Sequence, residues 1–105
     1  MGKFDFNKIE RKSFEITLKS GISLQVSMPA KRTFEKVTRF YDDVMGNDTN
    51  KIINVLYEIC AEIISNNNEK QVITAAELEL YDVEELTAFL SAYMEFVNTV
   101  KTNPN

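Results

Sequence analysis

The 105-residue sequence contains no histidine and no tryptophan, and it has one cysteine, two prolines and three glycines. Without histidine, the chain lacks the commonest general base of enzymes and a favoured ligand of zinc. Cys60 stands alone, so it can form neither an internal disulfide nor a thiolate zinc site, and no imidazole can activate it. The glycines are scattered, which excludes a glycine-rich phosphate-binding loop. We predict that the protein is not an enzyme and uses no metal or cofactor.

Carboxylates remain as candidate metal ligands, in the adjacent pairs Asp42-Asp43 and Glu84-Glu85. Neighbouring residues of a helix point about 100° apart, so the two carboxylates of such a pair do not converge on one ion. Glu84 and Glu85 are better explained by their position at a helix N-terminus, where negative charge is favourable. Neither pair therefore predicts a metal site.

Long hydrophobic runs are also missing. No stretch approaches the roughly 18 consecutive apolar residues of a membrane-spanning helix. The first residues lack the apolar segment of a secretion signal, and a lone cysteine within an apolar stripe fits a reducing compartment. The length is that of one domain. We expect a single cytoplasmic domain over residues 1–105 with no membrane partner.

Charge is divided unevenly along the chain. Residues 1–41 carry a net charge of +5, and residues 42–105 carry −9, which together give −4. Such a molecule can associate with itself through its basic N-terminal and acidic C-terminal halves, or attract a charged partner. Alternatively, the charges are the solvated faces of helices, since exposed ion pairs add little affinity.

Period-two alternation predicts a β-hairpin with one buried face over residues 13–28, around the turn Lys19-Ser20-Gly21. The residues on the apolar face are Phe14, Ile16, Leu18, Ile22, Leu24, Val26 and Met28. Phe4 and Phe6 alternate too, which leaves open a third strand or a loose arm at residues 1–12.

Helical spacing follows from residue 30 to residue 100. A first apolar stripe begins at Phe34 and ends before Gly46, a residue type that commonly terminates helices. Asp48 or Thr49 can cap a second helix. Its stripe is Ile52, Ile53, Leu56, Ile59, Cys60, Ile63 and Ile64. Three asparagines at positions 66–68 stop this helix, because asparagine favours turns.

Two sequences of the capping-box type follow. Thr74 to Glu77 opens a short helix ending near Leu80, and Asp82 to Glu85 starts the final helix. A polar tail occupies residues 101–105. The predicted fold is α+β and mostly α, with an antiparallel β-hairpin followed by about four helices.

The final helix has a wide apolar sector, and it supplies the candidate partner-binding residues. These are Phe89, Tyr93, Met94, Phe96 and Val97. If a domain of this size leaves part of the sector uncovered, exposed aromatics and an adaptable methionine would form a groove or seam for a partner helix or another copy. The alternative is that all five residues belong to the core.

A basic stripe on the first long helix raises the question of nucleic acid. Lys31, Arg32, Lys36 and Arg39 are interleaved with aromatic residues, as in some phosphate-binding and base-stacking surfaces. The aromatics match the buried stripe, however, and the isoelectric point near 4.8 opposes binding to a polyanion. We predict no nucleic-acid partner.

The last third of the chain carries a distinctive order of segments. It contains ITAAEL at residues 73–78, YDVEELTAFL at 81–90, EFVN at 95–98 and NPN at 103–105. Together with the hairpin, Pro29 and the helix that follows, this order resembles the tail assembly chaperones of long-tailed (siphovirus-type) phages and prophages of Gram-positive bacteria. The resemblance covers nearly the whole chain, and it consists of helix caps and apolar spacing rather than an invariant site.

This resemblance implies a function in phage tail assembly within the cytoplasm of a bacterial host. The chaperone would bind the long, helical tape measure protein, keep it soluble and help tail tube assembly, with the tail tube protein as a second candidate partner. Many family members also exist in a longer form made by translational frameshifting. The family supplies no catalytic residues. Two alternatives remain open, namely a generic bacterial protein-interaction domain and a small DNA-binding regulator.

Overall fold

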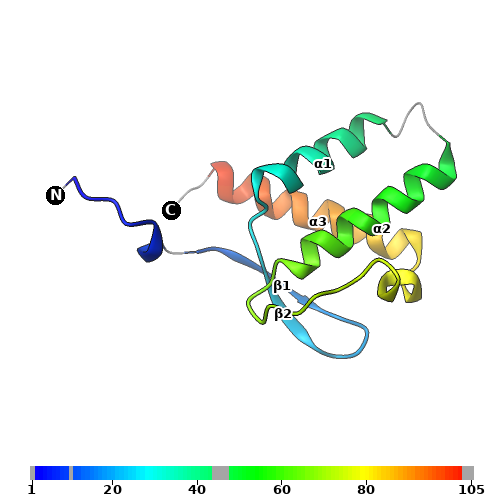
Figure 1. Cartoon of the computed structure of the whole chain (residues 1–105), viewed down its shortest axis with the longest axis horizontal. Helices are drawn as coiled ribbons and strands as arrows, with labels where there is room; N and C mark the ends of the chain where they lie inside the picture. Colours follow the sequence, from blue (N-terminus) through cyan, green and yellow to red (C-terminus); the bar gives the residue numbers. More distant parts are fainter. Residues whose placement is uncertain (1, 10, 44–47, 103–105) are drawn as a thin grey trace.

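The computed structural model describes residues 2–9, 11–43 and 48–102 (Figure 1). The element order is η1 (Phe6–Lys8), β1 (Ser13–Thr17), β2 (Ser23–Ser27), α1 (Lys31–Asp43), α2 (Thr49–Ser65), η2 (Glu77–Leu80) and α3 (Val83–Thr102). The prediction of an α+β fold with an N-terminal hairpin is confirmed. The described residues form three α-helices rather than about four, because the short segment after Thr74 is a 3-10 turn.

The hairpin lies within the predicted residues 13–28. Phe14 pairs with Val26 and Ile16 with Leu24, so the apolar residues of both strands lie on one face. At the turn, the Gly21 backbone adopts a φ of +94°, a conformation that only glycine reaches without strain. Leu24 and Val26 are fully buried, which places β2 in the core while the face of β1 is half-covered.

The free edge of β2 is occupied by the asparagine segment that follows α2. The Ser27 N–H donates to the Asn66 carbonyl at 2.9 Å, and the Asn68 N–H donates to the Gln25 carbonyl at 3.1 Å. The asparagine segment therefore ends α2 and also forms backbone hydrogen bonds with the otherwise open edge of β2.

The third strand considered around Phe4 and Phe6 is not formed. Phe6 begins the 3-10 turn η1, which Asp5 caps by accepting a hydrogen bond from the Asn7 N–H. The N-terminal residues form an arm that extends away from the helices (Figure 1).

Helix boundaries follow the predicted caps. Asp48 accepts from the Asn50 N–H and caps α2, whose C-cap is Asn66. At α3 the capping box is reciprocal: Asp82 accepts from the Glu85 N–H at 2.7 Å, and Glu85 accepts from the Asp82 N–H at 2.8 Å. The predicted helix end at Gly46 lies outside the described residues, and α3 runs into the segment expected to be tail.

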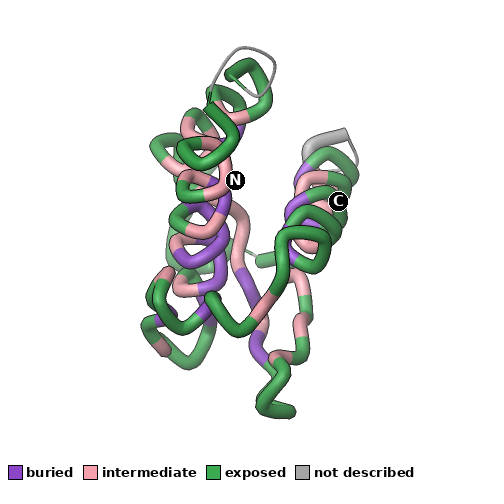
Figure 2. Tube along the Cα trace, turned by 90° about the vertical axis from the view of Figure 1, so that its right-hand side faces the viewer, coloured by how far each residue is buried: buried purple, intermediate pink, exposed green. Residues whose placement is uncertain are grey.

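The core lies between the helices and the hairpin. Figure 2 shows α1 with α2 on one side and α3 on the other, with buried residues on the sides that face each other and along β2. Its largest fully buried side chains are Tyr93, Leu24, Ile63, Leu78, Leu86 and Leu90. Helix α1 packs mainly on α2 and contributes one fully buried residue, Val37. The rest of its apolar face is only partly covered.

Candidate partner-binding surfaces

The five residues predicted to bind a partner lie along one side of α3, but they differ in their exposure to solvent. Tyr93 is 1% exposed and Val97 is 3% exposed, so both are core residues of the free chain. The Tyr93 hydroxyl donates to the Ser27 carbonyl, and burial raises the pKa of this hydroxyl above its ordinary value. Phe89, Met94 and Phe96 are partly buried and pack against the core.

The hairpin fills the aromatic seam predicted on α3. The Phe14 ring of β1 lies 6.4 Å from the ring of Phe89, 6.0 Å from Tyr93 and 5.4 Å from Phe96, centroid to centroid. These distances are typical of favourable aromatic contacts. An open seam over Tyr93 is therefore not present in the free chain, because β1 occupies it. Binding by the partly exposed Phe89, Met94 and Phe96 stays a prediction.

Met94 lines a shallow hollow between α1 and α3. The hollow has a volume of about 580 Å³ and is open to solvent. It is lined by Tyr41, Ser91, Met94, Glu95, Asn98 and Thr99. Only two of these side chains are large and apolar, so this surface offers little hydrophobic area to a partner.

A groove with more apolar side chains in its lining runs between α1 and α2, with a volume of about 290 Å³. Its apolar lining consists of Phe40, Ile52, Val55 and Ile59. Charged residues of both signs surround these side chains, namely Lys36, Arg39, Lys51, Asp43, Glu58 and Glu62. An apolar floor with a charged rim is the arrangement that binds one face of an amphipathic helix.

One part of the rim is fixed by polar contacts between the two helices. Lys36 of α1 forms a 2.7 Å ion pair with Glu62 of α2, which also accepts a hydrogen bond from the Thr33 hydroxyl. The ammonium and the hydroxyl hold the pKa of Glu62 below its ordinary value. These contacts hold α1 and α2 together beside the groove, so the groove is a preformed feature of the free chain.

The basic stripe considered for nucleic acid is thus partly used within the chain. Lys36 is paired with Glu62, while Lys31, Arg32 and Arg39 are exposed on α1. The two acidic pairs also have separate positions: Asp42 and Asp43 end α1, and Glu85 caps α3. Within residues 2–9, 11–43 and 48–102, no group of three or more carboxylates and cysteines could hold a metal ion.

Cys60, the single cysteine of the sequence, is buried in the core. It is fully shielded from solvent, and this burial raises the pKa of the thiol to about 12. At neutral pH the thiol is therefore protonated, which is the unreactive form. Its Sγ lies 3.9 Å from the Leu86 carbonyl. Cys60 thus serves as a packing residue between α2 and α3.

Sequence reasoning did not identify the groove between α1 and α2. The predicted stripe of the second helix accounts for Ile52 and Ile59 as core, but it leaves out Val55, whose apolar side chain widens that face toward α1. The sequence did contain a signal for the groove: Val55 is an apolar residue beside a stripe that is already sufficient for packing.

Comparison with known proteins adds no identification. No family model matches the sequence, no curated protein matches it, and no solved structure matches the fold. Among the helices in the described part of the chain, none combines the length and hydrophobicity needed to cross a membrane.

Proposed function

We propose that this chain is a tail assembly chaperone that binds the tape measure protein of a long-tailed phage or prophage and keeps it soluble. The family resemblance of the sequence suggests this partner, and the groove between α1 and α2 is the observation that supports a helical ligand. The tape measure protein expected from the resemblance is long, helical and apolar, so its unassembled form would aggregate without a cover.

The groove suits such a ligand in its chemistry. Phe40, Ile52 and Val55 are partly exposed, so an incoming apolar face can bury them further without opening the core. Charges of both signs on the rim can pair with the polar side of a helix in more than one register. A binding site of this kind holds many similar helical segments rather than one unique sequence, which suits a chaperone for a long, helical and apolar partner.

Co-expression tests the proposal directly. The tape measure protein of the same phage or prophage is produced alone, with this chain, and with two groove variants. We expect the wild-type chain to move the tape measure protein into the soluble fraction and to co-purify with it. Ile52→Glu places a charge on the apolar floor and should abolish both effects. Lys51→Glu reverses a rim charge on exposed surface and should weaken co-purification without affecting the fold.

A matched control separates binding from folding. Val72→Glu adds the same charge at a residue that is 71% exposed and outside the groove. It should retain full solubilising activity, and circular dichroism should show native helix content for every variant used. The proposal is overturned if the tape measure protein precipitates equally with and without the wild-type chain. Solubilisation by both groove variants at the wild-type level would remove the groove as the binding site.

A further inference from the structure

Two exposed apolar surfaces with opposite charge lie apart in this molecule. The first is the N-terminal arm, defined as residues 2–12, whose described part carries Phe4 and Phe6 at 68% and 74% exposure. Their rings contact each other edge to face, 4.8 Å apart, and no other aromatic contact to them is found among the described residues. With Ile9, also exposed, they give the arm an apolar side that nothing in the described chain covers.

The second surface is the acidic knob, defined as residues 77–85, which comprises η2 and the start of α3. Leu80 is 80% exposed there, the highest value among the large hydrophobic residues, and Val83 is 40% exposed. Single exposed leucines are common, but an exposed leucine on a rigid turn is a preformed contact point.

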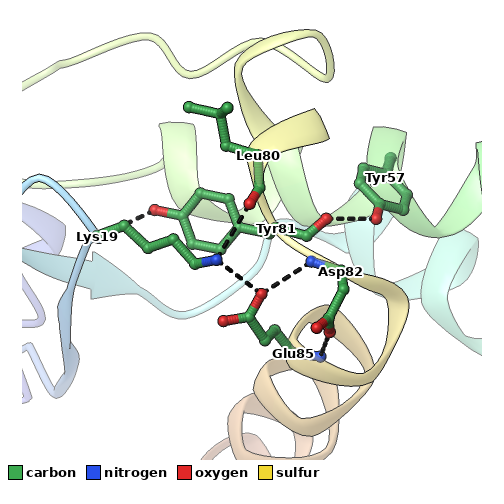
Figure 3. A network of polar contacts seen from close by, with 6 residues as sticks. All are labelled: Lys19, Tyr57, Leu80, Tyr81, Asp82 and Glu85. Atoms are coloured by element: carbon green, nitrogen blue, oxygen red, sulfur yellow. Dashed lines mark hydrogen bonds and ion pairs between the residues drawn. The ribbon is translucent and has the colours of Figure 1, made fainter.

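A polar network fixes the backbone of the knob (Figure 3). Lys19 at the hairpin turn donates to the Leu80 carbonyl at 3.0 Å and forms a 2.8 Å ion pair with Glu85. The Tyr81 hydroxyl accepts from the Lys19 N–H, and the Tyr81 carbonyl accepts from the Tyr57 hydroxyl at 2.6 Å. Figure 3 shows the Leu80 side chain pointing away from this network, so the bonds that hold its backbone leave the side chain outside.

Charge makes the arm and the knob complementary. The arm has a net charge of +2, from Lys3, Lys8, Arg11 and Lys12 against Asp5 and Glu10. The knob has a net charge of −5 and contains no lysine or arginine, and Glu77, Glu79 and Glu84 are exposed. Lys19 offsets one of these charges through Glu85. The exposed glutamates of the knob are therefore close to Leu80 in the sequence, and the basic residues of the arm are close to Phe4 and Phe6.

Their positions favour contact between copies. The arm (dark blue) and the knob (yellow) lie at opposite ends of the molecule in Figure 1, which extends 53 Å along its longest axis. Helix α3, which begins at the knob and runs toward the end that bears the arm, has 20 residues and is therefore about 30 Å long. In this arrangement an arm meets the knob of another molecule, not its own.

We propose that the arm of one copy binds the acidic knob of a second copy, so that the chains associate head to tail. Phe4 and Phe6 cover Leu80 and Val83, and the basic residues of the arm face the exposed glutamates. Because the contact joins two different surfaces, a bound pair still presents one free arm on one copy and one free knob on the other. Association then continues into a ring or a filament. The inference concerns the chain alone and does not depend on the proposed function.

Sedimentation velocity on the full chain tests this association. An arm of this size buries less than the area of a standard stable interface, so the contact should be weak and reversible. We expect the mean sedimentation coefficient to rise with protein concentration at low ionic strength. It should fall toward the monomer value at high salt, where the attraction between arm and knob is screened. A wild-type chain that remains monomeric at every concentration and salt level would overturn the proposal.

Mixing two variants supplies the decisive measurement. The arm variant carries Phe4→Ser and Phe6→Ser, and the knob variant carries Leu80→Lys. Each variant alone should associate roughly tenfold more weakly or not at all, as loss of an apolar anchor predicts. Mixed together, they should form one-to-one pairs that do not grow further, because only one intact arm meets one intact knob.

The other outcomes are equally informative. If the mixture stays monomeric, or if either variant alone associates as the wild type does, arm and knob are not partners between copies and the proposal is overturned. Asn54→Lys adds a positive charge at an exposed residue of α2 and serves as the control for Leu80→Lys. It should associate like the wild type, and circular dichroism should show that all variants are folded.

Discussion

The hydroxyl of Tyr93 in α3 donates a 2.8 Å hydrogen bond to the backbone carbonyl of Ser27 in β2, joining residues 66 positions apart. The same ring packs against Phe14 of β1. A residue predicted to meet a partner thus fastens the hairpin to the last helix. This relationship changes what substitutions on α3 are expected to do.

Tyr93→Phe should remove the hydrogen bond and keep the packing. We expect a loss of about 1 kcal/mol in the free energy of unfolding, the usual net value of such a bond. Tyr93→Ala should cost about 3 to 5 kcal/mol, because it also empties a buried aromatic site. Urea denaturation followed by circular dichroism measures both changes. If Tyr93→Ala left stability unchanged, the position of Tyr93 in the core would be wrong.

Asn67 is a buried polar residue whose amide is fully used. Its Nδ2 donates to the carbonyls of Ile64 and Gln71, and its Oδ1 accepts from the N–H groups of Glu69 and Gln71. Asn67→Asp keeps the accepting oxygen but replaces the Nδ2 group, which donates both hydrogen bonds, with a carboxylate oxygen. This oxygen would face the carbonyls of Ile64 and Gln71, which repel it. We expect a loss of about 2 kcal/mol or more in the free energy of unfolding.

The next residue provides the matched control for this change. Asn68 is exposed and uses its Oδ1 to accept from the Gln25 N–H, which an aspartate can also do. Asn68→Asp should therefore have little effect in the same urea experiment. Equal destabilisation by the two substitutions would show that negative charge in the turn, rather than the lost donors of Asn67, is responsible.

Acid should weaken the contact between α1 and α2 through Glu62. The pKa of Glu62 is lower in the folded chain than its ordinary value of 4.5, first because of the bond from Lys36 and then because of the bond from Thr33. A carboxylate with a depressed folded pKa stabilises the fold above the unfolded value, and this stabilisation is lost as pH falls through the folded pKa.

Glu62→Gln isolates that contribution. The urea midpoint of the wild type should decrease as pH falls from 6 toward 3, and the decrease should be smaller in Glu62→Gln. Glu58→Gln makes the same substitution at an exposed neighbour on α2 and serves as the matched control. Identical pH profiles for the wild type and Glu62→Gln would show that the ion pair with Lys36 is too well screened by solvent to affect stability.

Cys60 should report on the opening of the core. Because burial raises the pKa of its thiol to about 12, very little thiolate is present at pH 8, and the sulfur is inaccessible. Iodoacetamide should modify the native chain slowly, through transient opening alone, and should modify the chain rapidly in strong urea. Mass spectrometry measures the modified fraction. Rapid modification without urea would contradict the burial of Cys60 between α2 and α3.

Local rules predicted the local parts of this fold. Alternation and Gly21 gave the hairpin its position, and the side chains of Asp48 and Asp82 marked the starts of two helices. The short helix expected from Thr74 is a 3-10 turn, in which the Thr74 hydroxyl accepts from the Glu77 N–H as half of a capping box. A capping signal fixes where a helical turn begins but not how far it continues.

The features that could not be predicted are contacts between distant residues. Nothing near Asn66 or Asn68 in the sequence indicates that their backbone pairs with β2. In the same way, the aromatic sector of α3 was visible in the sequence, whereas its cover by Phe14 depends on the direction in which the hairpin folds back. A wide apolar face on a helix predicts that another element packs on it, but it does not identify that element.

The packing of β1 on α3 also has a consequence for biosynthesis. The ribosome makes the hairpin before its aromatic cover, so Phe14 has none of its ring partners until Phe89, Tyr93 and Phe96 have been translated. A nascent chain that stops before α3 leaves the apolar side of its hairpin uncovered. The packing of β1 must therefore wait for the synthesis of α3.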